Sequence, residues 1–165
     1  MYKFTSLVAH WGQRREDIKI VSQRIVDFLG HLKQIQPDVF GQWYYSGMSR
    51  EESLERIMDI TVKNVMHELT ASKEERFDNL PLSFGGWNGA DTEEGAASMS
   101  FAMNGLVDFA KNNCVLRLPY GGSHRDFFLK KENQDRLIEL MKETWNPDYI
   151  MVDREKIWKR PWWKL

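Results

Sequence analysis

Cys114, Ser98 and Ser100 are of types that can act as nucleophiles, and their neighbours in the sequence indicate whether they do. Cys114 lies in NCVLRLP, where it alternates with Leu116 and Leu118 and shares their face of a predicted strand. A thiol on such a face is expected to be buried and chemically inert. Ser98 and Ser100 alternate on another predicted strand and lack the G-x-S-x-G turn that exposes a nucleophilic serine. We therefore predict no nucleophile and expect both serines on the solvent side of their strand.

The histidines and the acidic pairs of the sequence also lack the spacing that metal binding or acid–base catalysis requires. None of the four histidines stands at i+4 from another or in an H-E-x-x-H pattern: His10, His31, His67 and His124. The acidic pairs Glu51-Glu52 and Glu74-Glu75 are consecutive, so their carboxylates point apart and are expected to be solvated. The sequence thus predicts no catalytic residue, no metal site, no cofactor and no enzymatic activity.

A glycine-rich segment, GGWNG at residues 85–89, raises the question of phosphate binding. Its spacing matches neither the G-x-x-x-x-G-K-[ST] nor the G-x-G-x-x-G pattern, and no helix is predicted to open behind it. The acids that follow it would repel a phosphate. Asn88-Gly89 instead favours the positive φ of a tight turn, and a strand-like alternation resumes near residue 96. We interpret the segment as a hairpin with an acidic tip and with Trp87 at its shoulder, and Gly85-Gly86 as a place where the strand bends or a neighbour comes close.

Aromatic and acidic side chains near turns remain as candidate contact residues. Trp and Tyr are the usual anchors of protein interfaces, and exposed acids steer a basic partner. The predicted partner-binding residues are Trp43, Tyr45, Trp87, Asn88, Asp91, Glu93 and Glu94. The alternative for Trp43 and Trp87 is burial in the core, and the alternative for the three acids is simple solvation. The sequence leaves both alternatives open.

Periodicity places these residues on an α+β framework. Predicted strands cover residues 2–11, 40–47, 81–87, 96–105, 113–119 and 148–153. Predicted helices cover residues 14–35, 49–69 with a break near Asp59, and 132–145. Ser49 and Glu52 form the S-x-x-E capping signature that opens the second helix. The order β-α-β-α-β-β-β-α-β predicts a single domain with an antiparallel or mixed sheet of about five to six strands and three main helices packed on it.

Composition and charge set the remaining expectations. The 165 residues are 42% hydrophobic and carry a net charge of −1 and one cysteine, which suits one domain in a reducing compartment and does not suit a nucleic-acid binder. No secretory signal or membrane span is visible, so we expect a soluble cytoplasmic protein.

The charge is distributed unevenly along the chain. Residues 74–94 hold six acids against one base, a net of −5, whereas residues 154–165 hold five bases against one acid, a net of +4. We place the domain at residues 1–153 and expect the basic aromatic tail, residues 154–165, to pack on it.

Several segments, in this order, resemble the immunity protein 52 family of bacterial polymorphic toxin and type VI secretion systems. They are FGQWYYSGMSREESLER (40–56), the Trp87-Asn88-Gly89 turn, ASMSFAMNG (97–105), NNCVLRLP (112–119) and LIELMKETWNPDYIMV (137–152). Together they span most of the chain. The long N-terminal helix contributes little to the resemblance, and the tail after Asp153 is expected to be particular to this chain.

The resemblance implies a non-enzymatic antitoxin that sits in the cytoplasm of the producing cell and binds a cognate toxin. For this family, the resemblance implies a nuclease-type toxin with a restriction-endonuclease-like domain. The acidic tip could enter such a nuclease's electropositive cleft, which would give stoichiometric inhibition by occlusion. Two other classes stay open: a small ligand-binding or enzymatic α+β domain with a pocket that the sequence does not reveal, and a nucleic-acid-binding module that uses the basic tail.

Overall fold

Alternation of apolar and polar side chains gives the strands one buried and one open face. In β3 (Ser98–Met103), the side chains of Met99, Phe101 and Met103 are buried, whereas Ser98 is half-buried and Ser100 is exposed. This confirms the predicted placement of the two serines. The other strands are β1 (Ser6–Trp11), β2 (Leu82–Trp87), β4 (Asn112–Arg117), β5 (Tyr149–Val152) and β6 (Glu155–Lys159).

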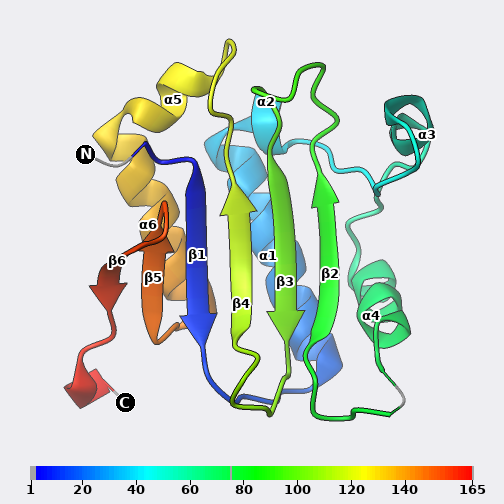
Figure 1. The fold of residues 1–165 in the computed structure, drawn as a ribbon, viewed down its shortest axis with the longest axis vertical. Coiled ribbons are helices and arrows are strands. Elements are labelled where there is room, and N and C mark those ends of the chain that lie inside the picture. The colour runs from blue at the N-terminus through cyan, green and yellow to red at the C-terminus, as the bar shows by residue number, and fades with distance from the viewer. Residues whose placement is uncertain (1–2, 75, 165) are drawn as a thin grey trace.

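These strands form one six-stranded sheet in the order β2-β3-β4-β1-β5-β6, with every neighbouring pair antiparallel (Figure 1). The computed structural model describes residues 3–74 and 76–164, so Glu75 lies outside the described residues. The helices are α1 (Ile18–Ile35), α2 (Pro37–Phe40), α3 (Arg50–Leu54), α4 (Val62–Ala71), α5 (Arg125–Leu129) and α6 (Lys131–Trp145). The predicted α+β single domain is confirmed.

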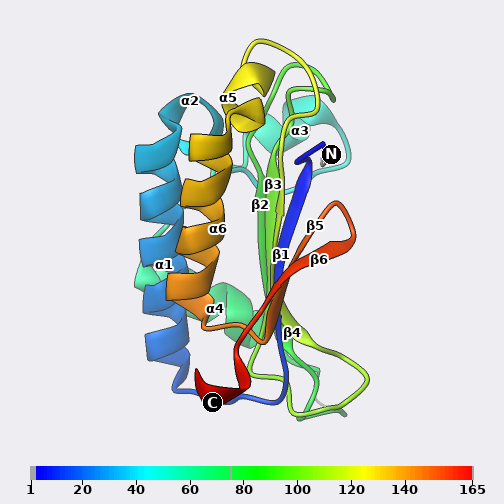
Figure 2. The same ribbon diagram turned by 90° about the vertical axis from the view of Figure 1, so that its left-hand side faces the viewer.

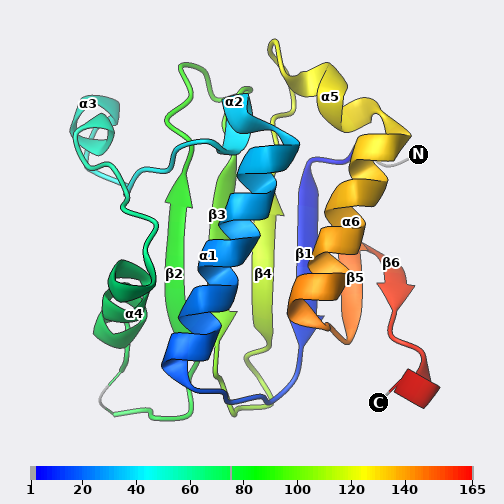
Figure 3. The ribbon, with the colours of Figure 1, turned by 180° about the vertical axis from the view of Figure 1, so that it is seen from behind.

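Helices α1 and α6 cover one face of the sheet, as Figures 2 and 3 show. The core between the layers is rich in aromatic rings. Trp145 of α6 stacks on Trp11 of β1 at 5.6 Å between ring centroids, and it also contacts Phe28 of α1 and Phe101 of β3 at 5.3 and 5.7 Å. None of the helices in the described residues lies across the opposite face of the sheet (Figure 1).

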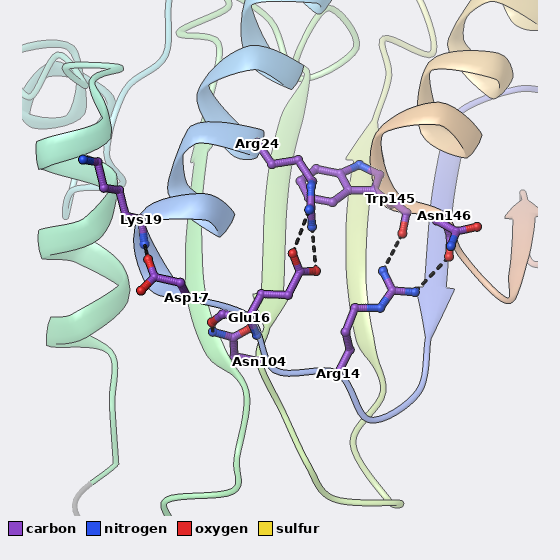
Figure 4. Close-up of polar contacts among 8 residues, drawn as sticks. All are labelled: Arg14, Glu16, Asp17, Lys19, Arg24, Asn104, Trp145 and Asn146. Atoms are coloured by element: carbon purple, nitrogen blue, oxygen red, sulfur yellow. Dashed lines mark hydrogen bonds and ion pairs between the residues drawn. The ribbon is translucent and has the colours of Figure 1, made fainter.

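A polar cluster fastens the connection between β1 and α1 to its neighbours (Figure 4). Arg14 donates to two carbonyl oxygens at the C-terminus of α6, at 2.6 and 2.9 Å, where a cation is favoured by the helix dipole. Arg24 donates two hydrogen bonds to the Glu16 carboxylate (2.8 and 2.7 Å), which lower the pKa of Glu16. Asn104, after β3, bonds both backbone groups of Glu16, and the Asp17 carboxylate caps α1. These contacts fix α1 over the sheet.

The prediction of a strand at residues 40–47 is wrong. Pro37 opens α2, which runs through Phe40, and Trp43 is 2% exposed and stacks on Phe40. Within this segment, Tyr44 alone among the described residues forms β-bridges, which are isolated ones to Ile57 and Trp87. The aromatic side chains of Phe40 and Trp43 are buried by packing, so the segment needs no continuous ladder.

The second predicted helix is divided where a break was expected. It forms α3 and α4, separated by residues 55–61, and the Ser49 hydroxyl accepts the backbone N–H of Glu52 (3.1 Å) as the capping signature predicted. Besides α2, elements at residues 125–129 and 155–159 were not anticipated. Residues Arg125–Leu129 form α5, and Glu155–Lys159, which were expected to lie in a packed tail, form the edge strand β6 against β5.

Candidate interaction surface

The connection between β2 and β3 is a structured hairpin tip, which we define as residues 88–96. Gly89 has a φ of +73°, and a Cβ built there would lie 2.5 Å from the ring of Tyr44, so both the turn and the packing require glycine. The side-chain oxygen of Asn88 accepts the backbone N–H groups of Ala90 and Ala97 (3.3 and 3.0 Å). Asn88 therefore holds the shape of the tip from within.

The three acids predicted as contact residues all lie exposed on this tip. Asp91 is anchored to α3 by an ion pair with Arg50 (2.7 Å), and its own side chain remains 95% exposed. The backbone carbonyl of Glu94 accepts two N–H groups from the loop after β4, those of Tyr120 and Gly121 (2.9 and 3.0 Å). The Ala90 carbonyl also accepts a long hydrogen bond from the Arg50 guanidinium (3.4 Å). The tip therefore presents Asp91, Glu93 and Glu94 from a backbone with contacts to α3 and to the loop after β4.

The predicted aromatic residues separate into three environments. Trp43 is in the core, so a partner cannot touch its ring while the fold is intact, and its place among the contact residues is corrected. Trp87 is half-buried at the shoulder of the tip, where its backbone exchanges two hydrogen bonds with Tyr44 (2.8 and 3.1 Å) and the two rings lie 6.3 Å apart. Tyr45 is half-buried beside α4.

The Tyr45 hydroxyl is tied to α4. It accepts a hydrogen bond from Asn64 (2.8 Å) and donates a long one to the Glu68 carboxylate (3.4 Å). Burial raises the pKa of Tyr45, and so does the negative charge of Glu68, so the hydroxyl stays protonated and serves as a donor. The guanidinium of Arg56 lies over the ring at 5.7 Å from its centroid.

A groove of about 600 Å³ begins between α4 and β2 and extends over β3 to Asn113 of β4, and we call it the β2 groove. Its lining residues are Tyr45, Glu68, Ala71, Ser72, Ser83, Phe84, Gly85, Ser100, Phe101, Ala102 and Asn113. Of these, only Tyr45 was predicted as a contact residue, and Gly85 was expected only to mark a bend or a close neighbour. In the sequence, the pair of glycines within a predicted strand was the feature that could have indicated this groove.

Basic side chains lie near β1 and β5, away from β2. His10 of β1 stacks on Tyr149 of β5 at 4.8 Å, and the Lys156 ammonium lies 4.4 Å from the centroid of the same tyrosine ring. Burial lowers the pKa of His10, and the nearby charges of Lys111 and Lys156 lower it further. The acidic tip and this basic region thus lie at different sides of one molecule.

The remaining candidate groups for chemistry are few. Cys114 is fully buried, and burial raises the pKa of its thiol well above the ordinary value, as its predicted strand face implied. Across residues 3–74 and 76–164, no cluster of three or more His, Cys, Asp or Glu side chains could hold a metal ion. In the same residues, no helix combines the length and the apolar character that crossing a membrane requires.

A protein-family model described as Immunity protein 52 matches residues 5–160, from the start of β1 to just beyond β6. The chain belongs to the immunity protein 52 family. The match includes residues 154–160, so this part of the tail is not particular to the chain, contrary to the expectation from its sequence. A search of curated proteins found no match to it. Membership in a family of immunity proteins implies a binding protein that recognises a toxin, and it favours a role other than catalysis.

Proposed function

We propose that this immunity protein neutralises a nuclease-type toxin by binding it stoichiometrically and covering its catalytic cleft. The observation that carries the proposal is the hairpin tip, where three exposed acids lie on a backbone that hydrogen-bonds to Arg50 of α3 and to the loop after β4. A nuclease cleft is electropositive because it binds a polyanion, so a rigid acidic projection is complementary to it.

Trp87 is the aromatic anchor of the proposed contact. It lies directly before the tip, and part of its indole surface is free to contact a partner. Partly exposed indoles beside charged rims are frequent hot spots, because they bury a large area with little loss of side-chain entropy. On this proposal, the complex forms in the cytoplasm of the producing cell and shields that cell's own nucleic acid until the toxin is exported.

The first test concerns the partner. The reading frame next to this gene should encode a toxin domain, and its co-expression with the immunity protein should give a single complex on size exclusion. The purified toxin domain should degrade nucleic acid, and one equivalent of the immunity protein should abolish that activity. A complex that forms while the toxin attacks a substrate other than nucleic acid would disprove the nuclease assignment and leave the binding role intact.

The second test concerns the tip. Reversing Asp91, Glu93 and Glu94 to lysine should weaken the complex on the order of 100-fold and reduce its dependence on salt, since exposed interfacial charges act mainly through steering and complementarity. The matched control reverses three exposed acids of α6, Glu132, Asp135 and Glu143, which changes the net charge equally. If both triple variants bind alike, the location of the acids has no role and the tip is not the contact.

The aromatic anchor is tested separately by a pair of alanine variants. Trp87→Ala should weaken binding at least tenfold with a modest change in Tm, since its ring is half-buried. Trp43→Ala should instead destabilise the fold by about 3–5 kcal/mol, because it empties a fully buried indole site. A Trp87→Ala variant with a lowered Tm and unchanged affinity would assign Trp87 to the core alone.

A further inference from the structure

The outer edge of β2 carries backbone groups that point away from the sheet. In an antiparallel ladder, hydrogen-bonded and non-hydrogen-bonded pairs alternate, so every second residue of an edge strand directs its N–H and C=O outward. Asn88 donates its N–H toward β3 (3.0 Å), whereas Trp87 exchanges both backbone bonds with Tyr44 on the outer side. The alternation therefore places the N–H and C=O of Gly85, and the C=O of Ser83, on the outer edge.

Two contacts bound this outer edge. Tyr44 pairs with Trp87 at one end, and the Ser72 hydroxyl accepts the N–H of Ser83 (2.8 Å) at the other. The stretch between them, with Ser83 and Gly85, lines the β2 groove, and Glu68, Ala71 and Ser72 line it from the side of α4. Helix α4 lies beside β2 in the ribbon (Figures 1 and 3). From Ser83 to Trp87 there are four residue steps, which at ~3.3 Å each give a length of roughly 13 Å. This length accommodates an extended segment of about four residues.

Gly85 leaves the middle of the groove without a side chain. A Cβ built on Gly85 would lie 3.0 Å from the Met99 carbonyl oxygen and 3.4 Å from the Ser100 Cβ, so even alanine would crowd β3 slightly. The hydroxyl-bearing residues Ser83 and Ser100 lie beside it in the lining. The floor is therefore low at Gly85 and carries two hydroxyl groups beside it, which suits the approach of another backbone.

The charge around the groove is negative. Residues 49–97 hold eleven acids and five bases, a net of −6, so the rest of the chain has a net of +5 to reach the total of −1. The described residues of this range include α3, α4, β2 and the hairpin tip, which lie on the β2 side of the sheet. Among the described residues that line the groove, Glu68 alone is charged. The groove is therefore complementary to a basic segment.

We propose that the outer edge of β2 binds an extended basic segment of the toxin as an added strand, with a lysine or arginine side chain of that segment directed at Glu68. One residue of the segment exchanges two backbone hydrogen bonds with Gly85, and the next suitably placed N–H donates to the Ser83 carbonyl. The proposal rests on the function proposed above, because it names how the same partner is held. Trp87 and the tip continue along the same strand, so both contacts belong to one surface.

The experiment compares two substitutions at one residue. Gly85→Pro removes the outward N–H, and an edge strand tolerates proline where that N–H faces outward. Gly85→Ala adds a comparable Cβ and keeps the N–H. Binding of each variant to the toxin domain from the neighbouring reading frame is measured by calorimetry. We expect Gly85→Pro to bind about 30-fold more weakly than Gly85→Ala, since it loses a hydrogen bond and leaves a partner carbonyl unpaired.

Amide hydrogen exchange of the unsubstituted protein gives a second measurement that does not depend on a variant's folding. The Gly85 amide should exchange quickly in the free chain and at least tenfold more slowly in the complex. The amides of Phe84 and Gly86 face β3 and should be protected in both states. Glu68→Gln should weaken the complex about fivefold and reduce its salt dependence, as expected for one partly exposed charge pair.

The outcomes separate the two proposals. A complex in which Gly85 stays unprotected, or in which the proline and alanine variants bind equally, overturns the added strand and leaves the proposed function standing. Protection of Gly85 in the free chain that disappears on dilution assigns the edge to a second copy of this chain and also overturns it. If the unsubstituted protein forms no complex with that toxin domain, the proposed function and the added strand fall together.

Discussion

Asp153 joins the start of the chain to its last hairpin, and its removal should show how much that junction contributes to stability. Its carboxylate accepts the backbone N–H groups of Phe4, Thr5 and Ser6 at 2.6, 2.8 and 3.2 Å, and the Thr5 hydroxyl at 3.0 Å. Asp153 and Arg154 form the two-residue turn between β5 and β6, with φ values of +48° and +72°. The residue therefore has two separable roles, as an acceptor and as a turn residue.

Two substitutions distinguish these roles. Asp153→Gly keeps the positive φ and loses every accepted hydrogen bond. Four bonds to a carboxylate would be worth several kcal/mol if buried, but this one is partly solvated, so we expect a loss of about 2–3 kcal/mol. Asp153→Asn suits the turn and keeps an acceptor oxygen without the charge, so we expect about 1 kcal/mol. For a chain of this length, these losses correspond to decreases in Tm of roughly 5–10 °C and 2–4 °C.

The dependence on pH gives the sharper test. Partial burial acts to raise the pKa of Asp153, but the hydrogen bonds from Thr5, Phe4 and Ser6 outweigh it, and the folded-state pKa is lowered. A lowered pKa means that the charged form stabilises the fold fully above the unfolded-state pKa of about 3.9, and that this contribution is lost as the pH falls through the folded-state value. The difference in free energy of unfolding between the unsubstituted protein and Asp153→Asn should therefore be constant near neutral pH and shrink below a pH of about 4.

Urea denaturation of the unsubstituted protein and of Asp153→Asn, followed by tryptophan fluorescence at several pH values between about 3 and 7, measures this difference directly. The reasoning is refuted if the two proteins differ by the same free energy at the acidic end as at neutral pH. It is also refuted if Asp153→Gly is no less stable than Asp153→Asn, because the accepted hydrogen bonds would then contribute nothing.

Local geometry at two glycines and at the cysteine gives further predictions. Gly89→Ala should destabilise the fold by about 1–3 kcal/mol in urea titrations, because it places a Cβ at positive φ against the Tyr44 ring, whereas Gly30→Ala in α1, where no described atom lies within 4 Å of the new Cβ, should stabilise it by up to about 1 kcal/mol. The thiol of Cys114 should react with a disulfide reagent only at the rate of unfolding, because it is buried and its pKa is raised; rapid labelling in the absence of denaturant would contradict this.

The sequence predicted best where a local pattern and tertiary burial agree. The alternation of β3, the turn at Asn88-Gly89 and the cap at Ser49 all depend on neighbours in sequence, and all three are confirmed. The strand expected at residues 40–47 failed because strand propensity mainly reports aromatic and β-branched content, and packing buried Trp43 without a ladder. Strand β6 was missed for the opposite reason, because an edge strand can be held by backbone pairing with little alternation in its side chains.

The candidate contact residues also divide into those that could be placed from neighbours in sequence and those that depend on tertiary packing. The acids of the tip could be placed from sequence, because a turn exposes whatever residues it contains. Glu68 and Ser83 could not, because they come together only when α4 packs beside β2, and that contact joins segments separated by a further connection. Trp43 and Trp87 have similar neighbours in sequence, since a glycine stands one or two residues before each. Tertiary packing alone decides that Trp43 is buried and Trp87 is partly exposed.

The order of the strands in the sheet determines where the acidic and basic parts of the chain lie in space. Helices α3 and α4, strand β2 and the hairpin tip follow one another in sequence, and β2 is an edge strand. The described residues of the acidic stretch, 49–74 and 76–97, therefore lie on one side of the molecule. Strands β5 and β6 lie at the other edge and carry the basic tail there. A net charge near zero therefore coexists with a charge dipole across the sheet, with acids toward β2 and bases toward β6. Such a dipole orients a basic partner toward β2 before contact, which is where the open backbone edge, Trp87 and the acidic tip lie together.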